Sequence, residues 1–217
     1  MNPFRALRRF AAMSPSRRWQ WLVFMRDRLV TRAIYIFRLR QCGKGTIVQK
    51  PLFWTPEFIE LGERVLIWRD CRIEGLQEYG GVSYEPNIKL GNEVSLQQSC
   101  HITAADKITI GDGTSLMYGV LVTDIDHDYA AIDVNILAQN LSVSRTEIGR
   151  NCFVGAGARI QAGTRLGDQC IVGANAVVRG AFPDHCVIVG VPARIVKRYD
   201  AATDSWRRTN AEGEFLQ

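Results

Sequence analysis

The sequence predicts an all-β solenoid, a parallel β-helix of hexapeptide repeats that follows an N-terminal α-helical arm. Aliphatic residues recur at every sixth position over long stretches between residues 61 and 178. A period of six fits neither an amphipathic helix nor a sustained strand alternation. It fits a coil in which each hexapeptide is one flat face and three faces close a turn of about 18 residues. A basic segment whose apolar residues have helical spacing precedes the coil.

Residues 1–50 form the predicted arm. They carry twelve Lys/Arg residues and one acidic residue, Asp27, whereas the whole chain has a net charge of only +5, so a basic arm precedes a mildly acidic body. A helix is expected over residues 14–40, because Ser14 can cap it and Pro15 suits its first position. One helical stripe contains the apolar residues Trp19, Leu22, Val23, Val30, Ala33, Ile34 and Phe37.

A basic amphipathic helix has two interpretations, which the sequence leaves open. It can lie on an anionic membrane surface, here through residues 1–45, or it can pack on its own coil or a neighbouring subunit. Nucleic acid is not an expected partner, because no nucleic-acid-binding module is present. No secretory signal and no apolar run of about 20 residues is found. We therefore expect a cytoplasmic protein, and the first of the two interpretations adds peripheral contact with the inner membrane face.

Residues 51–198 form the predicted coil, and 199–217 a C-terminal tail. The six-residue spacing continues without a break from Ile148 to Val178. Before that, it occurs in separate sets of three aliphatic residues. The aliphatic positions are Leu61, Ile67, Ile73, Leu90, Leu96, Ile102, Ile110, Leu116, Val122, Ile148, Val154, Ile160, Leu166, Val172 and Val178. The apolar fraction of 47% is sufficient for a packed core. Four of the six cysteines occupy the small position of the repeat, so buried free thiols are expected rather than disulfides.

Two segments interrupt the six-residue repeat. Residues 74–87 are expected to be a tolerated surface insertion. Residues 128–147 carry no hexapeptide phase and begin directly after His127, so we expect this loop to serve binding.

His127 is the candidate general base. A neutral imidazole suits the removal of a proton from a hydroxyl near pH 7. Asp124, Asp126 or Asp128 could orient the ring, and the spacing does not decide among them. His101 is expected on the surface, and His185 in a structural turn. No metal site is expected, since the Asp-x-Asp-x-Asp run lacks the glycine and glutamate of a calcium loop.

Residues 148–197, IGRNCFVGAGARIQAGTRLGDQCIVGANAVVRGAFPDHCVIVGVPARIVK, and the upstream TDIDHDY resemble the hexapeptide-repeat acetyltransferases. The likeness is strongest to their maltose/galactoside and lipopolysaccharide O-acetyltransferase branch, and it extends over residues 55–198. It implies a left-handed β-helix, a homotrimer with active sites between adjacent subunits, and acetyl-CoA as co-substrate along the coil edge.

The resemblance also implies roles for individual residues. His127 matches the catalytic histidine. The implied coenzyme A contacts are Ala156, Ala174, Arg179, Arg194 and Lys197, and the implied acceptor contacts are Ser99 or Gln98. Arg179 departs from the family pattern, which commonly has Thr followed by Lys where this chain has Arg179-Gly180.

The function expected from these features is transfer of acetyl from acetyl-CoA to a sugar hydroxyl, in surface-polysaccharide or lipopolysaccharide biosynthesis. Two alternatives stay open. One is N-acetylation of an amino sugar or acetylation of a small free sugar, and the other is a β-helix scaffold subunit without catalysis.

Overall fold

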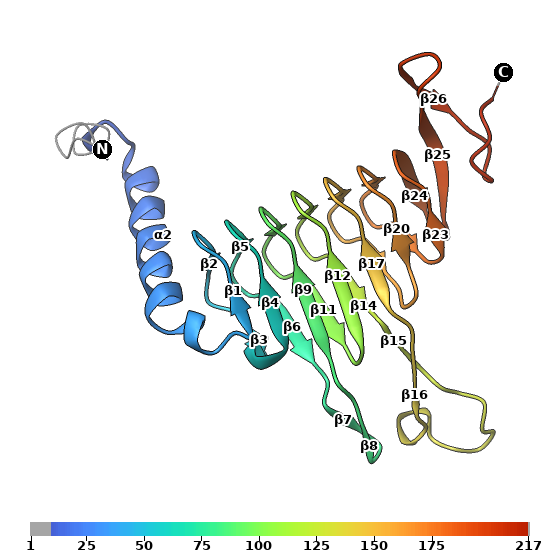
Figure 1. Ribbon diagram of the computed structural model, residues 1–217, viewed down its shortest axis with the longest axis horizontal. Helices are drawn as coiled ribbons and strands as arrows, with labels where there is room; N and C mark the ends of the chain where they lie inside the picture. The colour runs from blue at the N-terminus through green and yellow to red at the C-terminus, as the bar shows by residue number, and fades with distance from the viewer. Residues whose placement is uncertain (1–9, 217) are drawn as a thin grey trace.

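The computed structural model describes residues 10–216. Three sheets form the sides of a coil, and the chain enters each sheet in turn (Figure 1). Sheet A contains β1 (Gln41–Cys42), β4 (Ile59–Leu61), β9 (Asn87–Leu90), β12 (Lys107–Ile110), β17 (Thr146–Ile148), β20 (Arg165–Leu166) and β23 (Ala181–Phe182). Sheet B contains β2 (Ile47–Val48), β5 (Leu66–Ile67), β10 (Ser95–Leu96), β13 (Ser115–Leu116), β18 (Phe153–Val154), β21 (Ile171–Val172), β24 (Cys186–Gly190), β25 (Ala193–Asp200) and β26 (Ser205–Arg208). Sheet C contains β3 (Phe53–Trp54), β6 (Arg72–Gly75), β11 (His101–Ala104), β14 (Leu121–Thr123), β19 (Arg159–Ile160) and β22 (Val177–Val178).

The strand register follows the repeat. Val154 pairs in parallel with Val172, and Ile160 pairs in parallel with Val178. Each pair is one full turn of three hexapeptides apart in sequence. The prediction of parallel sheets behind an N-terminal helix is confirmed.

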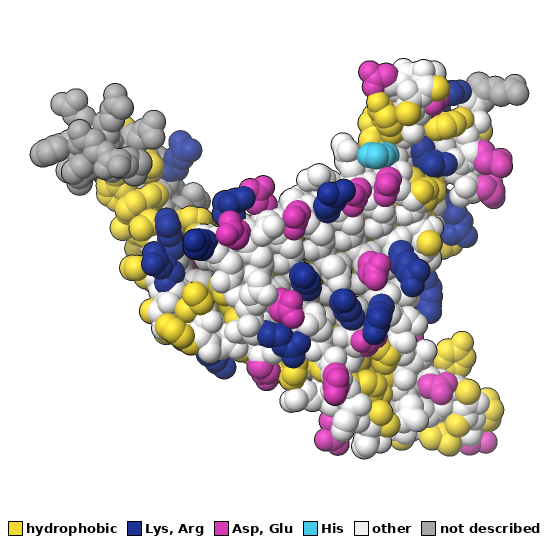
Figure 2. Space-filling view, viewed as in Figure 1, with side chains coloured by type: hydrophobic (Ala, Val, Ile, Leu, Met, Phe, Trp, Pro, Cys, Tyr) yellow, Lys and Arg dark blue, Asp and Glu magenta, His cyan; other side chains and the backbone are white. Residues whose placement is uncertain are grey.

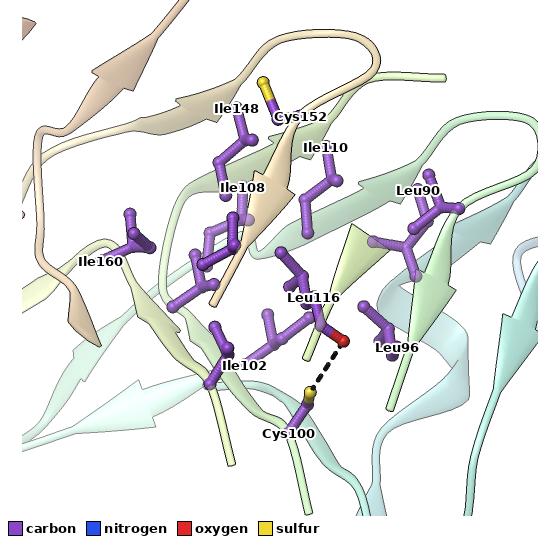
Figure 3. Close-up of a cluster of buried hydrophobic side chains, with 14 of the residues drawn as sticks. Leu90, Leu96, Cys100, Ile102, Ile108, Ile110, Leu116, Ile148, Cys152 and Ile160 are labelled. Carbon is purple, nitrogen blue, oxygen red and sulfur yellow. Dashed lines mark hydrogen bonds between the residues drawn. The ribbon is translucent and has the colours of Figure 1, made fainter. Parts of the chain in front are cut away.

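The aliphatic residues fill the interior of the coil, where they point toward one another (Figure 3). Ile102 stacks between its register partners Ile73 and Val122, and all three are fully buried. Burial of each such side chain contributes about 1.5–3 kcal/mol relative to exposure. Five cysteines are buried free thiols, namely Cys71, Cys100, Cys152, Cys170 and Cys186.

Helix α2 (Pro15–Ala33) covers the first coil, with Ser14 as its N-cap. Thr31, which is 1% exposed, accepts a hydrogen bond from the backbone N–H of Val48 at 2.9 Å. This contact satisfies a donor of β2 at the open end of the coil. The helix ends earlier than expected, because Ile34 leaves the helical backbone region, and the 3₁₀ turn η1 (Tyr35–Phe37) follows.

The side of α2 that faces the coil differs from the expected one. Asp27 and Thr31 are buried there, whereas the large apolar residues of the expected stripe are partly or largely exposed. Trp19 is 69% exposed and Phe37 81%. Figure 2 shows hydrophobic and basic side chains together over this helix. No helix among residues 10–216 is long and apolar enough to cross a membrane.

The ends of the coil extend beyond the expected boundaries. β1, β2 and β3 form the first coil, which therefore starts at Gln41 and includes the boundary expected between residues 50 and 51. A 3₁₀ turn, η2 (Pro56–Phe58), leads into the next coil. At the other end, β25 and β26 continue sheet B in antiparallel fashion, so part of segment 199–217 belongs to that sheet.

Two excursions leave the coil, both between sheet C and sheet A. The first is the hairpin of β7 (Glu78–Tyr79) and β8 (Val82–Ser83), which follows β6. The second follows β14 and consists of β15 (Ile125–His127), a loop with the 3₁₀ turn η3 (Ile136–Ala138), and β16 (Leu141–Val143). They project from the same side of the molecule (Figure 1).

Candidate active site

His127 is the last residue of β15, where the second excursion turns away from the coil. It pairs with Leu141 across the hairpin, and the next backbone N–H, of Asp128, donates to the carbonyl of Asn140 at 2.9 Å. The imidazole is exposed. Its Nδ1 lies 3.4 Å from the hydroxyl oxygen of Tyr79 in the other hairpin.

Asp124 is fully buried and holds two coils together. Its Oδ1 accepts from the backbone N–H of Ala105 at 2.8 Å, and its Oδ2 from that of Asp106 at 2.9 Å. Burial raises the pKa of the Asp124 carboxyl, and these backbone donors counteract part of the rise. Both carboxylate oxygens are therefore occupied by backbone groups.

Asp126 is paired with Arg179. The Arg179 guanidinium donates to Oδ2 of Asp126 at 2.7 Å from the end of β22, two coils further along. In β15, Asp126 points to the opposite face from His127, because successive side chains of a strand alternate. Asp128 accepts from the backbone N–H of Ala130 in its own loop. Within residues 10–216, no carboxylate forms a hydrogen bond with the imidazole of His127.

One corner, between sheets B and C, contains four of the residues expected to bind acceptor or coenzyme A, namely Gln98, Ser99, Ala156 and Ala174. Gly119 N–H donates to the carbonyl of Gln98 at 3.1 Å, and Asn175 N–H donates to that of Ala156 at 2.9 Å. Ala174 occupies the same turn position one coil after Ala156, and both alanines are exposed. We call this row of turns the B–C corner, made of Gln98–Ser99, Tyr118–Gly119, Ala156–Gly157 and Ala174–Asn175.

A pocket of about 510 Å³ lies along the B–C corner. Ser99, Ala156 and Ala174 line it together with Arg159 and His101. The pocket contains His101, which was expected on the open surface. Its Nε2 lies 2.8 Å from the Thr103 hydroxyl, and burial lowers the pKa of its imidazole, helped by the nearby positive charge of Arg72.

Gln98 lines a second pocket, of about 570 Å³, between the corner and α2. Arg194 and Lys197 lie on β25, where both are exposed. The structure thus brings Ser99, Ala156 and Ala174 into one pocket, with Gln98 beside it.

His127 does not lie at this corner. It belongs to the excursion at the opposite edge of sheet C. The strands of sheet C are two to four residues long, and five residues, 120–124, lie between Gly119 at this corner and the start of β15. At roughly 3.3 Å per residue, the two edges are separated by more than 10 Å. In a single chain, His127 and the B–C corner therefore lie at opposite edges of sheet C.

Sequence reasoning did not identify Tyr79 as a site residue. A signal for it was present, because both excursions follow the third aliphatic of a triplet, Ile73 in one case and Val122 in the other. Equal phase places both at the same corner of a three-sided coil. Within residues 10–216, no group of three His, Cys, Asp or Glu side chains is arranged to hold a metal ion.

Residues 145–180, which run from the end of the second excursion through β22, match the family model of the bacterial transferase hexapeptide, six repeats. The chain carries the hexapeptide repeat of bacterial transferases. The match covers the hexapeptide-repeat coils that contain Ala156 and Ala174.

Two relatives extend the similarity of this hexapeptide-repeat protein beyond these coils. It is 29% identical over 192 residues to WbbJ of Escherichia coli (strain K12), by name a lipopolysaccharide biosynthesis O-acetyl transferase, covering 85% of this chain and 91% of WbbJ. It is also 29% identical over 200 residues to Rv3034c of Mycobacterium tuberculosis, by name an acetyltransferase. That match covers 90% of this chain but 60% of Rv3034c.

A solved structure shares the fold of the hexapeptide-repeat coil. It is AntD, an N-acyltransferase from Bacillus cereus, in complex with dTDP and 3-hydroxybutyryl-CoA. The TM-score is 0.65 at 17% identity, with 80% of this chain and 90% of AntD covered.

Proposed function

We propose that this protein is an acetyl-CoA-dependent O-acetyltransferase that acetylates a sugar hydroxyl. The observation that carries the proposal is that one chain presents both an exposed imidazole, His127, on the β15–β16 hairpin and a row of small exposed residues on a hexapeptide-repeat coil. The likeness to acetyltransferases over most of the chain supports it.

His127 acts as the general base. Its imidazole takes the proton of the acceptor hydroxyl as the oxygen attacks the carbonyl of the acetyl group, and later returns the proton to the departing sulfur. Acetyl-CoA supplies the thioester carbonyl and the thiol leaving group. No carboxylate is needed to receive the proton, because a neutral imidazole accepts it at neutral pH.

The B–C corner fits the arm of coenzyme A. Ala156 and Ala174 present a methyl group each at a turn, so an extended chain can approach the backbone there. Arg194 and Lys197 are exposed on β25, and within residues 10–216 neither forms an ion pair, so their cationic groups suit phosphates. Arg179 is expected at this ligand as well, although in the structure its guanidinium pairs with Asp126.

The complete site is shared between copies of the chain. We propose a left-handed coil that assembles as a homotrimer, in which His127 of one copy faces the B–C corner of the next. The separation of these two parts across sheet C supports this arrangement. The apolar residues exposed on the loop after His127, Ile132 at 82% and Leu137 at 67%, provide a surface for a neighbour to cover.

The acceptor is a glycan of surface-polysaccharide or lipopolysaccharide assembly, as the name of WbbJ suggests for that relative. The exposed apolar and basic surface of α2 would place the enzyme at the inner membrane face, where lipid-linked glycans are available. Mild alkali distinguishes the alternative product, since it removes an O-acetyl ester and leaves the amide of an amino sugar intact.

Substitution of the proposed base tests the function. His127→Asn should lower turnover of a glycan acceptor by about 100-fold or more, the usual scale for a lost general base, while affinity for coenzyme A is retained. The matched control is His185→Asn, because His185 lies away from both parts of the site and asparagine tolerates its left-handed backbone (φ 57°).

Near-normal turnover of His127→Asn would remove His127 as the base. Absence of coenzyme A binding by the wild-type chain in isothermal titration would favour a scaffold without catalysis.

A further inference from the structure

The first excursion contacts the second at the candidate base. β7 and β8 are joined by Gly80 and Gly81, whose φ values of 58° and 79° are those of a tight hairpin turn that glycine readily adopts. The hairpin is closed at its base by a hydrogen bond from Tyr84 N–H to the carbonyl of Gln77 at 2.8 Å. This short, braced ribbon presents Tyr79 to the loop that follows His127.

The phenol of Tyr79 makes two polar contacts. Its hydroxyl donates to the carbonyl of Leu137 at 2.8 Å, and its oxygen lies 3.4 Å from Nδ1 of His127. The two rings also meet edge to face, with centroids 5.5 Å apart and planes at 65°. Tyr79 therefore contacts both the loop and the imidazole.

The hydrogen count of these contacts limits which state of His127 can form a hydrogen bond with the phenol. A phenol has one hydrogen to donate, and the short contact to the Leu137 carbonyl uses it. The phenol oxygen can then offer only a lone pair to Nδ1, so a hydrogen bond between them requires the hydrogen on Nδ1. In a neutral imidazole with its hydrogen on Nδ1, Nε2 carries the free lone pair.

We propose that Tyr79 is a positioning residue that keeps neutral His127 in the Nδ1–H tautomer and directs the lone pair of Nε2 toward the acceptor hydroxyl. This inference rests on the proposed role of His127 as general base. It assigns to the first excursion, and not to Asp124, Asp126 or Asp128, the task of orienting the ring. The contact at 3.4 Å is long for a hydrogen bond. Catalytic hydrogen bonds are often long in enzymes without substrate and tighten in the complex.

The tautomer can be measured without turnover. Protein labelled with ¹⁵N-histidine, studied by long-range ¹H–¹⁵N correlation at a pH where the ring is neutral, distinguishes a protonated from an unprotonated ring nitrogen. The signals of His127 are assigned by their loss in His127→Asn. The wild type should show a protonated Nδ1, whereas Tyr79→Phe should shift the population toward protonated Nε2, which is the form a free imidazole prefers in water.

Tyr84→Phe is the matched control. It removes a phenol hydroxyl from the same hairpin, and among the described residues that hydroxyl has no hydrogen-bond partner. The control should keep the wild-type tautomer. A protonated Nε2 in the wild type, or an unchanged tautomer in Tyr79→Phe, would overturn the proposal.

Kinetics separates positioning from a purely structural role. Tyr79→Phe should lower kcat about tenfold, the scale of one hydrogen bond to a functional group, and leave KM for acetyl-CoA unchanged. A loss confined to KM would indicate that Tyr79 only supports the loop, and would count against the proposal. If His127→Asn stays active while Tyr79→Phe still changes the tautomer, Tyr79 does set the tautomer of His127, but His127 is not the general base.

Discussion

At the residue scale, the three aspartates around His127 have separate roles that their spacing does not reveal. Asp124 is the last residue that still follows the coil, and its buried carboxylate accepts two backbone N–H groups of the preceding coil. Asp126 already belongs to the hairpin and pairs with Arg179. Their spacing suggests a common side of one strand, but the chain turns off the coil between them. The sequence could identify the acidic cluster, but not the different contacts that its aspartates make.

Asp124 should matter for stability rather than turnover. Asp124→Asn replaces one acceptor oxygen by an NH₂ group that faces a buried backbone N–H, and an unsatisfied buried donor costs about 1–3 kcal/mol. We expect a loss of that size in the free energy of unfolding, measured by urea denaturation. The turnover of the folded fraction should stay within about twofold of wild type, a change below 0.5 kcal/mol.

The control is Asp128→Asn, because that carboxylate is exposed and accepts one hydrogen bond within its own loop. Its effect on stability should be smaller than about 0.5 kcal/mol, as for most surface substitutions. A stable Asp124→Asn variant with strongly reduced turnover would return Asp124 to the chemistry.

At the element scale, the repeat predicted the coil and the positions of its two interruptions, but not the contacts that the interruptions make. Periodicity identifies which side chains enter the core, since each aliphatic meets its equivalents on adjacent coils. It carries no information about what a non-repeating segment contacts. Segment 74–87 was expected to be a neutral insertion, yet it holds Tyr79 against His127. Contacts between two excursions depend on their lengths and folds, which no period describes.

Helix α2 shows a similar limit. Helical spacing predicted an apolar stripe, but the coil contacts the side of α2 that contains Thr31. The Thr31 hydroxyl accepts a hydrogen bond there from a backbone N–H of β2. The larger apolar residues of the stripe are thereby left exposed. Arginines flank it on the same helix, and this combination is typical of helices that lie on anionic membranes. Residues 1–9 of the expected contact segment 1–45 lie outside the described residues.

The exposed apolar surface of α2 and of the following turn η1 should bind anionic vesicles. We expect the triple variant Leu22→Gln, Leu29→Gln and Phe37→Gln to bind vesicles containing phosphatidylglycerol at least about tenfold more weakly, since each side chain loses roughly 1 kcal/mol or more of apolar burial. Co-sedimentation with vesicles measures this, and uncharged phosphatidylcholine vesicles serve as the control. The circular dichroism of the variant should be that of the wild type, because these three side chains are 48%, 64% and 81% exposed. Equal binding of variant and wild type would exclude α2 as the contact.

At the scale of the whole molecule, the proposed trimer rests on where His127 and the B–C corner lie in one chain. His127 projects from one edge of sheet C and the B–C corner forms the other, so no bending of a rigid coil brings them together in one chain. In a ring of identical chains, each interface joins two different surfaces of the protein. Such an interface can place the hairpin of one copy over the corner of the next. The exposed apolar side chains that gather over the second excursion in Figure 2 suit that contact.

Mixed assemblies test the shared site directly. His127→Asn removes the base, and Ala174→Trp fills the row where the coenzyme arm is proposed to lie, so each variant alone should be inactive. When both are unfolded, mixed in equal amounts and refolded, an intact site forms wherever Ala174→Trp supplies the hairpin and His127→Asn supplies the corner. For random assembly of a closed ring with head-to-tail interfaces, this holds at about a quarter of the interfaces. The mixture should therefore recover about a quarter of the wild-type turnover, and analytical ultracentrifugation should show a trimer throughout. Wild-type protein refolded in parallel sets the full value. If the trimer forms and the mixture stays inactive, the His127 and the B–C corner of an active site must belong to one chain. The excursion would then have to move across sheet C during catalysis.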